Sequence, residues 1–132
     1  MKISYSMLSF DPIEIITPWS SKHLGVDVKT DDVCTMCNGV VVSILKDGDG
    51  LFGVTIQYDG EHLFRYMHLK DINVELNDAV QMRYRIGHAS KYVHVELLSR
   101  SIGDKHFPVR IGSNTFYKQN PIKYIKNELR ME

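Results

Sequence analysis

Short runs of valine, isoleucine, tyrosine and phenylalanine alternate with turn-forming residues along most of this chain. Runs of this kind, bounded by glycine, aspartate, asparagine or proline, are typical of β-strands. The pattern predicts strands near 23–28, 32–36, 39–45, 52–58, 62–67, 83–87, 92–98 and 106–111. The predicted fold class is therefore mainly β, with antiparallel sheets.

Turn signals and one short helical stripe complete this prediction. Asp-Gly pairs within 47–50 and at 59–60 indicate tight turns, and the second predicts a β-hairpin between 54–58 and 62–68. A helix is expected only after Pro121, because proline suits a first helical turn. The apolar stripe of that C-terminal helix consists of Ile122, Ile125 and Leu129.

The length and composition predict a single domain with one hydrophobic core. With 132 residues, 43% hydrophobic and 24% charged, and with no linker or repeat, the chain is expected to form one domain over 1–132. Sixteen basic and sixteen acidic residues give a net charge of zero, which argues against a general electrostatic hold on nucleic acid. No apolar run is long enough to cross a bilayer.

The first five residues lack the apolar stretch and cleavage site of a secretory signal peptide. The sequence therefore predicts synthesis in the cytoplasm. Cys34 and Cys37 form a CxxC pair without the second pair that a zinc ribbon needs. We interpret them as ordinary strand and turn cysteines, with a local disulfide or redox role as the alternative.

Three residues have the spacing of a zinc site with an open coordination position. His23 and Asp27 lie four residues apart, and His94 lies in a distant strand pattern. In an extended strand His23 and Asp27 share a face but are separated by about 13 Å, so joint ligation requires a bend, for which Gly25 supplies backbone freedom. The alternative is that both histidines are merely polar members of half-buried strands.

Further motifs accompany this spacing in a fixed order. They are HLGVD at 23–27, GVV at 39–41, YMHL at 66–69, HVE at 94–96 and NPIKY at 120–124. Together they resemble the lysostaphin-type (LytM-like) zinc metallopeptidases, which cut peptidoglycan cross-bridges. The resemblance covers about residues 12–125 and implies the antiparallel, duplicated hybrid motif-like fold of that peptidase domain.

The resemblance also implies roles for individual residues. His23, Asp27 and His94 correspond to the ligands of Zn²⁺, which polarises the scissile carbonyl and lowers the pKa of a bound water toward roughly 7. His68 falls where the family keeps a catalytic histidine; the alternative is a hairpin-end histidine with one ordinary hydrogen bond. Glu96 shares a strand face with His94, either as the acceptor that orients this imidazole or as a plain exposed carboxylate.

Several positions depart from the family pattern. Tyr92 replaces the first histidine of the H-x-H motif, and a free tyrosine, which titrates near pH 10, is a poor base at neutral pH. The loop before this motif has shrunk to 89–91, and Arg83 replaces a turn glycine, which predicts an altered backbone path. Asn77 is a milder change, because asparagine tolerates positive φ. His88 is an alternative substitute for the missing histidine.

Two functions follow from the matches and the departures. The first is a zinc-dependent endopeptidase-like domain with peptidoglycan peptide as substrate, weakened by Tyr92. The second is a catalytically inactive relative that serves as a structural or cell-wall-binding module, for example in a phage particle. A protein of either kind that carries no export signal is expected to reach the cell wall after lysis or as part of a virion.

Overall fold

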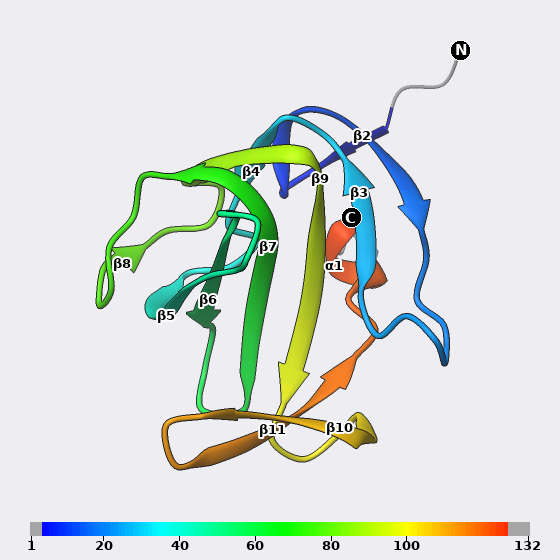
Figure 1. Ribbon diagram of the computed structural model, residues 1–132, viewed down its shortest axis with the longest axis vertical. Helices are drawn as coiled ribbons and strands as arrows, with labels where there is room; N and C mark the ends of the chain where they lie inside the picture. The colour runs from blue at the N-terminus through cyan, green and yellow to red at the C-terminus, as the bar shows by residue number, and fades with distance from the viewer. Residues whose placement is uncertain (1–3, 127–132) are drawn as a thin grey trace, which may run out of the picture.

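The computed structural model describes residues 4–126, which form eleven strands and one short helix (Figure 1). The strands are β1 (Ser4–Ser6), β2 (Ser9–Thr17), β3 (Val26–Lys29), β4 (Asp32–Cys34), β5 (Gly39–Lys46), β6 (Phe52–Gln57), β7 (His62–Ile72), β8 (Ala79–Val80), β9 (Arg85–Ser99), β10 (Asp104–Ile111) and β11 (Asn114–Gln119). The helix α1 spans Ile122–Ile125. No helix in this part of the chain has the length and apolar character that a bilayer crossing requires.

The strands pair in the order β1-β2-β3-β9-β7-β6-β5-β8, and every pairing is antiparallel. The fifteen-residue β9 is the centre of this arrangement, because it also pairs with β4 and with β11. Figure 1 shows β7 and β9 side by side through the middle of the molecule, with the β10–β11 hairpin across their lower end. The expected mainly antiparallel β fold is confirmed.

The strand boundaries differ from the sequence pattern in several places, and β1, β8 and β11 were not predicted. The runs predicted at 83–87 and 92–98 belong to one continuous strand, β9, and the run predicted from 23 begins as a strand only at Val26. The strand β2 was missed because Pro12 interrupts its apolar pattern. The described part of the C-terminal helix is a single turn with Ile125 buried, and Leu129 lies outside the described residues.

Side chains alternate between two faces of the central strands. Phe64 and Tyr66 of β7 join Val95 of β9 in the main hydrophobic core. Leu63 and Leu98, on the opposite face, pack with Phe116 of the β10–β11 hairpin in a smaller cluster. The rest of this second face is not covered by the hairpin, and the polar residues of β3, β7 and β9 lie there.

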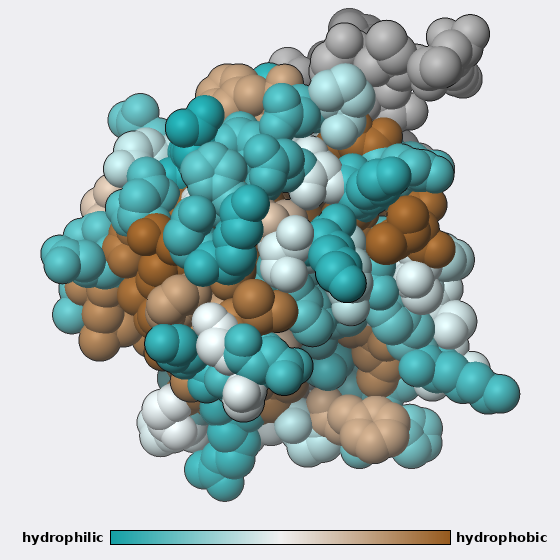
Figure 2. Space-filling model, turned by 45° about the horizontal axis from the view of Figure 1, so that its top comes forward, coloured by the Kyte–Doolittle hydropathy of each residue, from teal (hydrophilic) through white to brown (hydrophobic). Residues whose placement is uncertain are grey.

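Large hydrophobic side chains are also exposed at one edge of the sheet. Figure 2 shows hydrophobic surface toward the side of the molecule where β5 and β8 lie in Figure 1. The exposed residues of these strands and of the segments beside them are Val40, Leu45, Leu76 and Met82.

Candidate metal centre

Strand alternation places three polar residues of β9 on the face opposite the main core. Val93 and Val95 are fully buried in the core, so Tyr92, His94 and Glu96 project from the other face. The neighbouring β3 behaves in the same way, because Asp27 lies between two fully buried valines. Asp27 and His94 are direct cross-strand partners, which brings their side chains together.

His23 reaches the same place through a turn that precedes β3. Its backbone exchanges two hydrogen bonds with Ser20, at 3.0 and 3.1 Å, and the chain bends before Val26. As a result His23 Nε2 lies 3.2 Å from Asp27 Oδ2. The expected bend between these two residues is confirmed.

Gly25 has a steric role in this turn. A Cβ atom added to it would lie 2.5 Å from both Cε1 and Nε2 of His94. Real Cβ atoms do not approach other heavy atoms so closely, so a side chain here would displace the imidazole. Gly25 does not adopt the left-handed conformation that its expected backbone freedom would allow.

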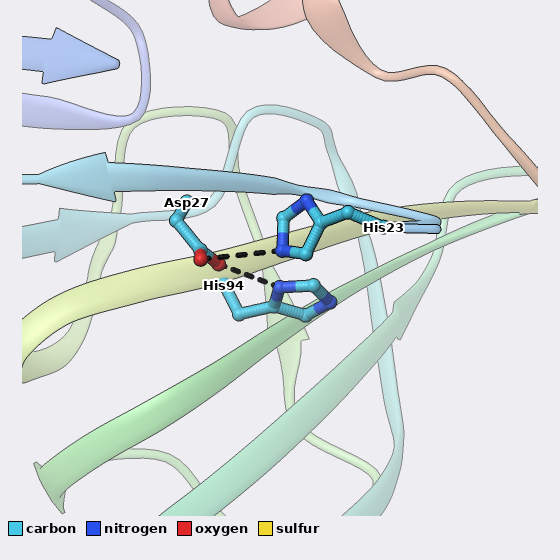
Figure 3. A group of neighbouring side chains, drawn as sticks. All are labelled: His23, Asp27 and His94. Carbon is cyan, nitrogen blue, oxygen red and sulfur yellow. Dashed lines mark hydrogen bonds and ion pairs between the residues drawn. The ribbon is translucent and has the colours of Figure 1, made fainter. Parts of the chain in front are cut away.

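The three predicted ligands converge (Figure 3). One ligand atom from each of His23, Asp27 and His94 lies within 4.8 Å of the others. The Asp27 carboxylate faces both imidazoles, with His94 Nδ1 2.7 Å from Asp27 Oδ1. The two imidazole rings are 5.0 Å apart and nearly perpendicular, at 80°.

Hydrogen bonds at the far sides of the imidazoles fix which nitrogens face Asp27. The nitrogen His23 Nδ1 lies 3.1 Å from the carbonyl oxygen of Pro18, and His94 Nε2 lies 3.0 Å from Glu96 Oε2. Both partners are acceptors, so these nitrogens carry the protons and the opposite ring nitrogens present lone pairs to Asp27. Either a proton or a metal ion between these atoms would satisfy the facing lone pairs, and this donor set fits a divalent metal ion.

Glu96 is buried, with 3% of its surface exposed, which excludes the alternative of a plain exposed carboxylate. Besides His94 it pairs with Lys118 at 3.0 Å and with Arg65 at 3.3 Å. Burial favours the neutral acid, but hydrogen bonding to His94 and the charges of Lys118 and Arg65 outweigh it and lower the pKa of Glu96. It is thus an ionised acceptor.

The pKa of His94 is shifted in the opposite direction to that of Glu96. Burial alone would lower its pKa, but the hydrogen bonds to Glu96 and Asp27 outweigh burial and raise the pKa. Without a metal ion, a proton on Nδ1 would satisfy the close contact with Asp27. A metal ion would therefore compete with a proton for this nitrogen.

The remaining predicted residues, His68 and Tyr92, line the same open pocket of about 360 Å³ beside the three ligands. Their ring centres lie 4.9 Å apart, and the His68 ring lies 6.2 Å from that of His94. His68 has φ of 69°, a left-handed conformation that is strained for any residue with a Cβ. It lies where the β7–β9 register is interrupted, between Met67 and Leu69.

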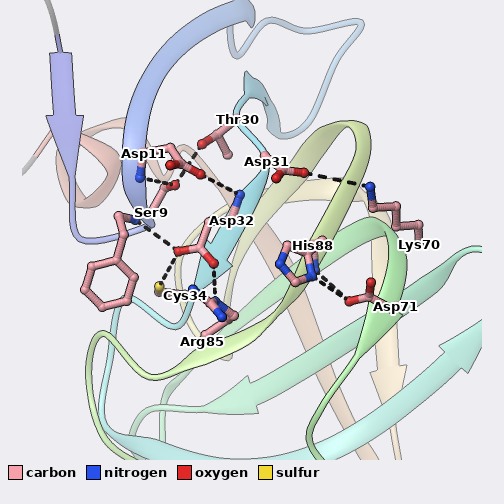
Figure 4. Close-up of polar contacts among 11 residues, drawn as sticks. Ser9, Asp11, Thr30, Asp31, Asp32, Cys34, Lys70, Asp71, Arg85 and His88 are labelled. Carbon is pink, nitrogen blue, oxygen red and sulfur yellow. Dashed lines mark hydrogen bonds and ion pairs between the residues drawn. The ribbon is translucent and has the colours of Figure 1, made fainter.

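The departures from the family pattern have different structural outcomes. Arg83 adopts φ of 75° and Asn77 φ of 74°, so each takes a left-handed conformation that glycine would favour. Arg83 thus keeps a conformation that is open to glycine, and an altered backbone path at this turn stays a prediction. The shortened segment 89–91 is part of β9. His88 does not line the metal pocket, because its Nδ1 pairs with Asp71 Oδ1 at 2.9 Å (Figure 4).

The cysteines lie away from this centre. Both Cys34 and Cys37 are buried free thiols. Burial raises the pKa of Cys34 to about 12 and that of Cys37 to about 11. Figure 4 shows Cys34 beside buried Asp32, whose carboxylate also accepts from Arg85 and from the Phe10 backbone. This cluster ties β4 to β2 and β9.

Sequence reasoning did not identify Arg65, Lys118 or the Pro18 carbonyl as parts of the site. Arg65 is the cross-strand partner of Glu96, and Lys118 comes from the adjacent β11. Strand register brings Arg65 and Lys118 to the site, and the loop before β3 brings the Pro18 carbonyl, so the sequence contains no local signal for these groups.

Comparisons with known proteins extend these observations. No protein-family model matches the chain. A curated relative from Buchnera aphidicola subsp. Baizongia pistaciae (strain Bp), named "Uncharacterized metalloprotease", is 32% identical over 81 residues. That match covers 59% of this chain but only 21% of the relative.

Several solved structures have a similar backbone. The antimicrobial peptidase lysostaphin from Staphylococcus simulans aligns over 95% of this chain and 53% of its own, with a TM-score of 0.63 and 20% identity. A zinc-containing peptidase from Vibrio cholerae aligns over 74% of this chain and 37% of its own, with a TM-score of 0.63 and 20% identity. A chain of the SpoIIQ–SpoIIIAH pore-forming complex aligns over 94% of this chain and 92% of its own, with a TM-score of 0.69 and 17% identity.

The TM-scores establish a common fold, and identities of 17–20% show nothing beyond that fold. The expected resemblance is confirmed to that extent, and the candidate metal site of His23, Asp27 and His94 lies in a chain of this architecture. The chain therefore has the lysostaphin-type peptidase fold.

Proposed function

We propose that this chain is a zinc-dependent endopeptidase-like domain that acts on peptidoglycan cross-bridge peptides, with a rate reduced by Tyr92. The convergence of His23, Asp27 and His94 beside an open pocket carries this proposal. Two imidazole nitrogens and one carboxylate oxygen are a donor set that zinc accepts, and three protein ligands leave a coordination position free. The similar fold of a zinc-containing peptidase supports the choice of metal.

The chemistry divides between the metal and the pocket residues. His23, Asp27 and His94 would hold a zinc ion, which would supply Lewis-acid polarisation of a peptide carbonyl and would lower the pKa of a water molecule. His68 lines the pocket, and its imidazole takes a proton from the attacking water molecule and later gives that proton to the leaving amine. Tyr92 keeps its phenolic proton and donates a hydrogen bond to the oxygen on which negative charge develops.

The replacement of histidine by Tyr92 limits the rate. A neutral phenol stabilises charge but does not accept a proton, so acid–base work falls on His68 alone. General acid–base help is typically worth about 10²–10⁴-fold. We therefore expect slow cleavage.

Metal analysis and wall digestion test this proposal. Purified protein should hold about one zinc ion per chain, and Asp27→Ala should lose it while Asp31→Ala retains it. Asp31 is a suitable control because its side chain is 69% exposed and, among residues 4–126, forms an ion pair only with Lys70 at 3.9 Å. Wild type should release peptides slowly from purified peptidoglycan, and Tyr92→His should release them at least about tenfold faster.

A structural or wall-binding module is the second candidate. It is favoured by Tyr92 and by the occurrence of this fold in a chain of a pore-forming complex. Failure of both wild type and Tyr92→His to release peptides, with zinc bound, would support this alternative. Equal rates for the two proteins would instead contradict the role assigned to Tyr92.

A further inference from the structure

A second hollow adjoins the metal pocket on the same face of the sheet. It has a volume of about 260 Å³ and lies over β5, β6 and β7. The two hollows share Met67 and His68 as lining residues, so they form one continuous surface. We call this hollow the Gly53 groove; its lining includes Leu45, Gly53, Thr55, Arg65, Met67 and His68.

The strand register explains why the groove is open. Leu45 pairs with Gly53, and Thr55 pairs with Arg65, so these residues lie in neighbouring rows on adjacent strands. Gly53 has no side chain to fill its position. A Cβ atom there would meet Met67 Cγ at 3.6 Å, an ordinary contact, so the fold does not require glycine at this point. The missing side chain instead leaves space beside the metal pocket.

The lining is mostly apolar, and Arg65 is the cation that lies deepest in the sheet face beneath it, while Lys46 lies at the rim. Arg65 is 15% exposed and donates one hydrogen bond, from Nη1 to Glu96 Oε1. A guanidinium has five N–H donors, and the buried Arg65 Nε has no partner among residues 4–126. Lys118 also pairs with Glu96, so two cationic side chains face one carboxylate.

The rim of the groove is electrically balanced. Lys46 and Asp47 both line it, and Asp47 Oδ1 accepts hydrogen bonds from the backbone of Asp49 and Leu51. The unbalanced charge beside the groove is therefore the positive charge around Arg65. An apolar hollow next to a cation suits an aliphatic side chain with a neighbouring carboxylate.

We propose that the Gly53 groove binds the part of a peptide substrate next to the cleaved bond and selects a small aliphatic side chain that has a carboxylate beside it. An oligoglycine segment would leave the groove unfilled and is expected to bind more weakly. This inference rests on the proposed function, because it takes the metal pocket as the place where the substrate's peptide bond lies.

Three synthetic probes test this selectivity on the zinc-loaded protein. They are N-acetyl-alanyl-alanine, its C-terminal amide and N-acetyl-glycyl-glycine, titrated while amide resonances are followed by NMR. The first probe should shift Gly53, Thr55 and Arg65 and bind about tenfold more tightly than its amide. Each buried methyl group should improve binding about fourfold relative to the glycine probe. Equal affinities, or shifts confined to other residues, would overturn the proposal.

Substitution of the groove floor provides the matched test. Gly53→Val should weaken binding of N-acetyl-alanyl-alanine at least tenfold while zinc content stays unchanged. Gly60→Val is the control, because a Cβ at Gly60 meets nothing within 4 Å. If Gly53→Val fails to fold, Gly53→Ala makes the same test with a smaller loss. Wild-type affinity in a folded Gly53 variant would contradict the assignment.

The binding measurements do not depend on cleavage. Probe binding in the groove without release of wall peptides would leave the groove assignment standing and remove the proposed function. Release of wall peptides without probe binding would leave the proposed function standing and remove the groove assignment.

Discussion

Gly25 lies against the ring that completes the metal centre, because a Cβ atom on it would come within 2.5 Å of His94. Gly25→Ala is therefore expected to push the imidazole away from Asp27. We expect zinc affinity to fall by at least about tenfold and stability by about 1–3 kcal/mol, as in other overpacked sites. Zinc competition with a chelating dye and urea denaturation measure the two effects. Gly48→Ala, with nothing within 4 Å of its added Cβ, should behave as wild type.

Glu96 holds His94 by accepting a hydrogen bond from Nε2 at 3.0 Å. Glu96→Gln keeps an oxygen acceptor of the same shape and should retain most of the zinc affinity. Glu96→Ala removes the acceptor and leaves Arg65 and Lys118 without their carboxylate. We expect its zinc affinity to fall by about 10- to 100-fold. Equal affinity in the alanine variant and wild type would show that Glu96 does not position the imidazole.

Residues at the site differ in how far sequence could identify them. His23, Asp27 and His94 were predictable because they occur within ordered motifs, and the turn before β3 brings them together. The carboxylate of Glu96 could be placed on the face of His94 by alternation, but its burial could not. That burial depends on Arg65 and Lys118, which cross-strand register supplies from β7 and β11.

Strands were predictable where apolar alternation is unbroken and were less predictable where small or polar residues near the site interrupt it. The strand β9 was predicted as two pieces because the small and polar segment 89–91 separates its apolar runs. Pairing with β3, β4 and β7 keeps it continuous despite this composition. The register of β7 is interrupted beside this part of β9, at His68. Tertiary pairing therefore overrides local propensity at the site itself.

The turn before β8 depends on a left-handed residue. Asn77 has φ of 74°, and its N–H donates to the Val41 carbonyl at 2.8 Å. Asn77→Gly should leave stability unchanged or raise it by up to about 1 kcal/mol, whereas Asn77→Val should lower it by about 1–2 kcal/mol. The midpoints of urea unfolding report both changes.

A neighbouring substitution separates backbone strain from a general effect of valine. Leu76 is 54% exposed and is not among the described residues with positive φ. Leu76→Val should therefore change stability by less than about 0.5 kcal/mol. A loss as large as that of Asn77→Val would show that the left-handed conformation is not the cause.

The whole molecule encloses two thiols that report on its unfolding. Cys34 and Cys37 are buried, with pKa values raised to about 12 and about 11 by burial. The reactive thiolate is therefore scarce at pH 8, and we expect Ellman's reagent to react with neither cysteine in the folded protein. Both should react at once in concentrated guanidinium chloride. Rapid reaction of either thiol under native conditions would contradict their burial.

The proposed metal site would join parts of the molecule that are distant in sequence, because Asp27 and His94 are 67 residues apart. A zinc ion that binds only the folded state stabilises it by about 2.7 kcal/mol when its free concentration is 100 times its dissociation constant. For a domain of this size, we expect a chelator to lower the melting temperature by about 10 °C. Calorimetry with and without zinc measures this shift, which Asp27→Ala should abolish. A zinc-dependent shift that survives in Asp27→Ala would show that the stabilising zinc ion binds elsewhere. A wild-type melting temperature that does not change with zinc would contradict zinc binding at His23, Asp27 and His94.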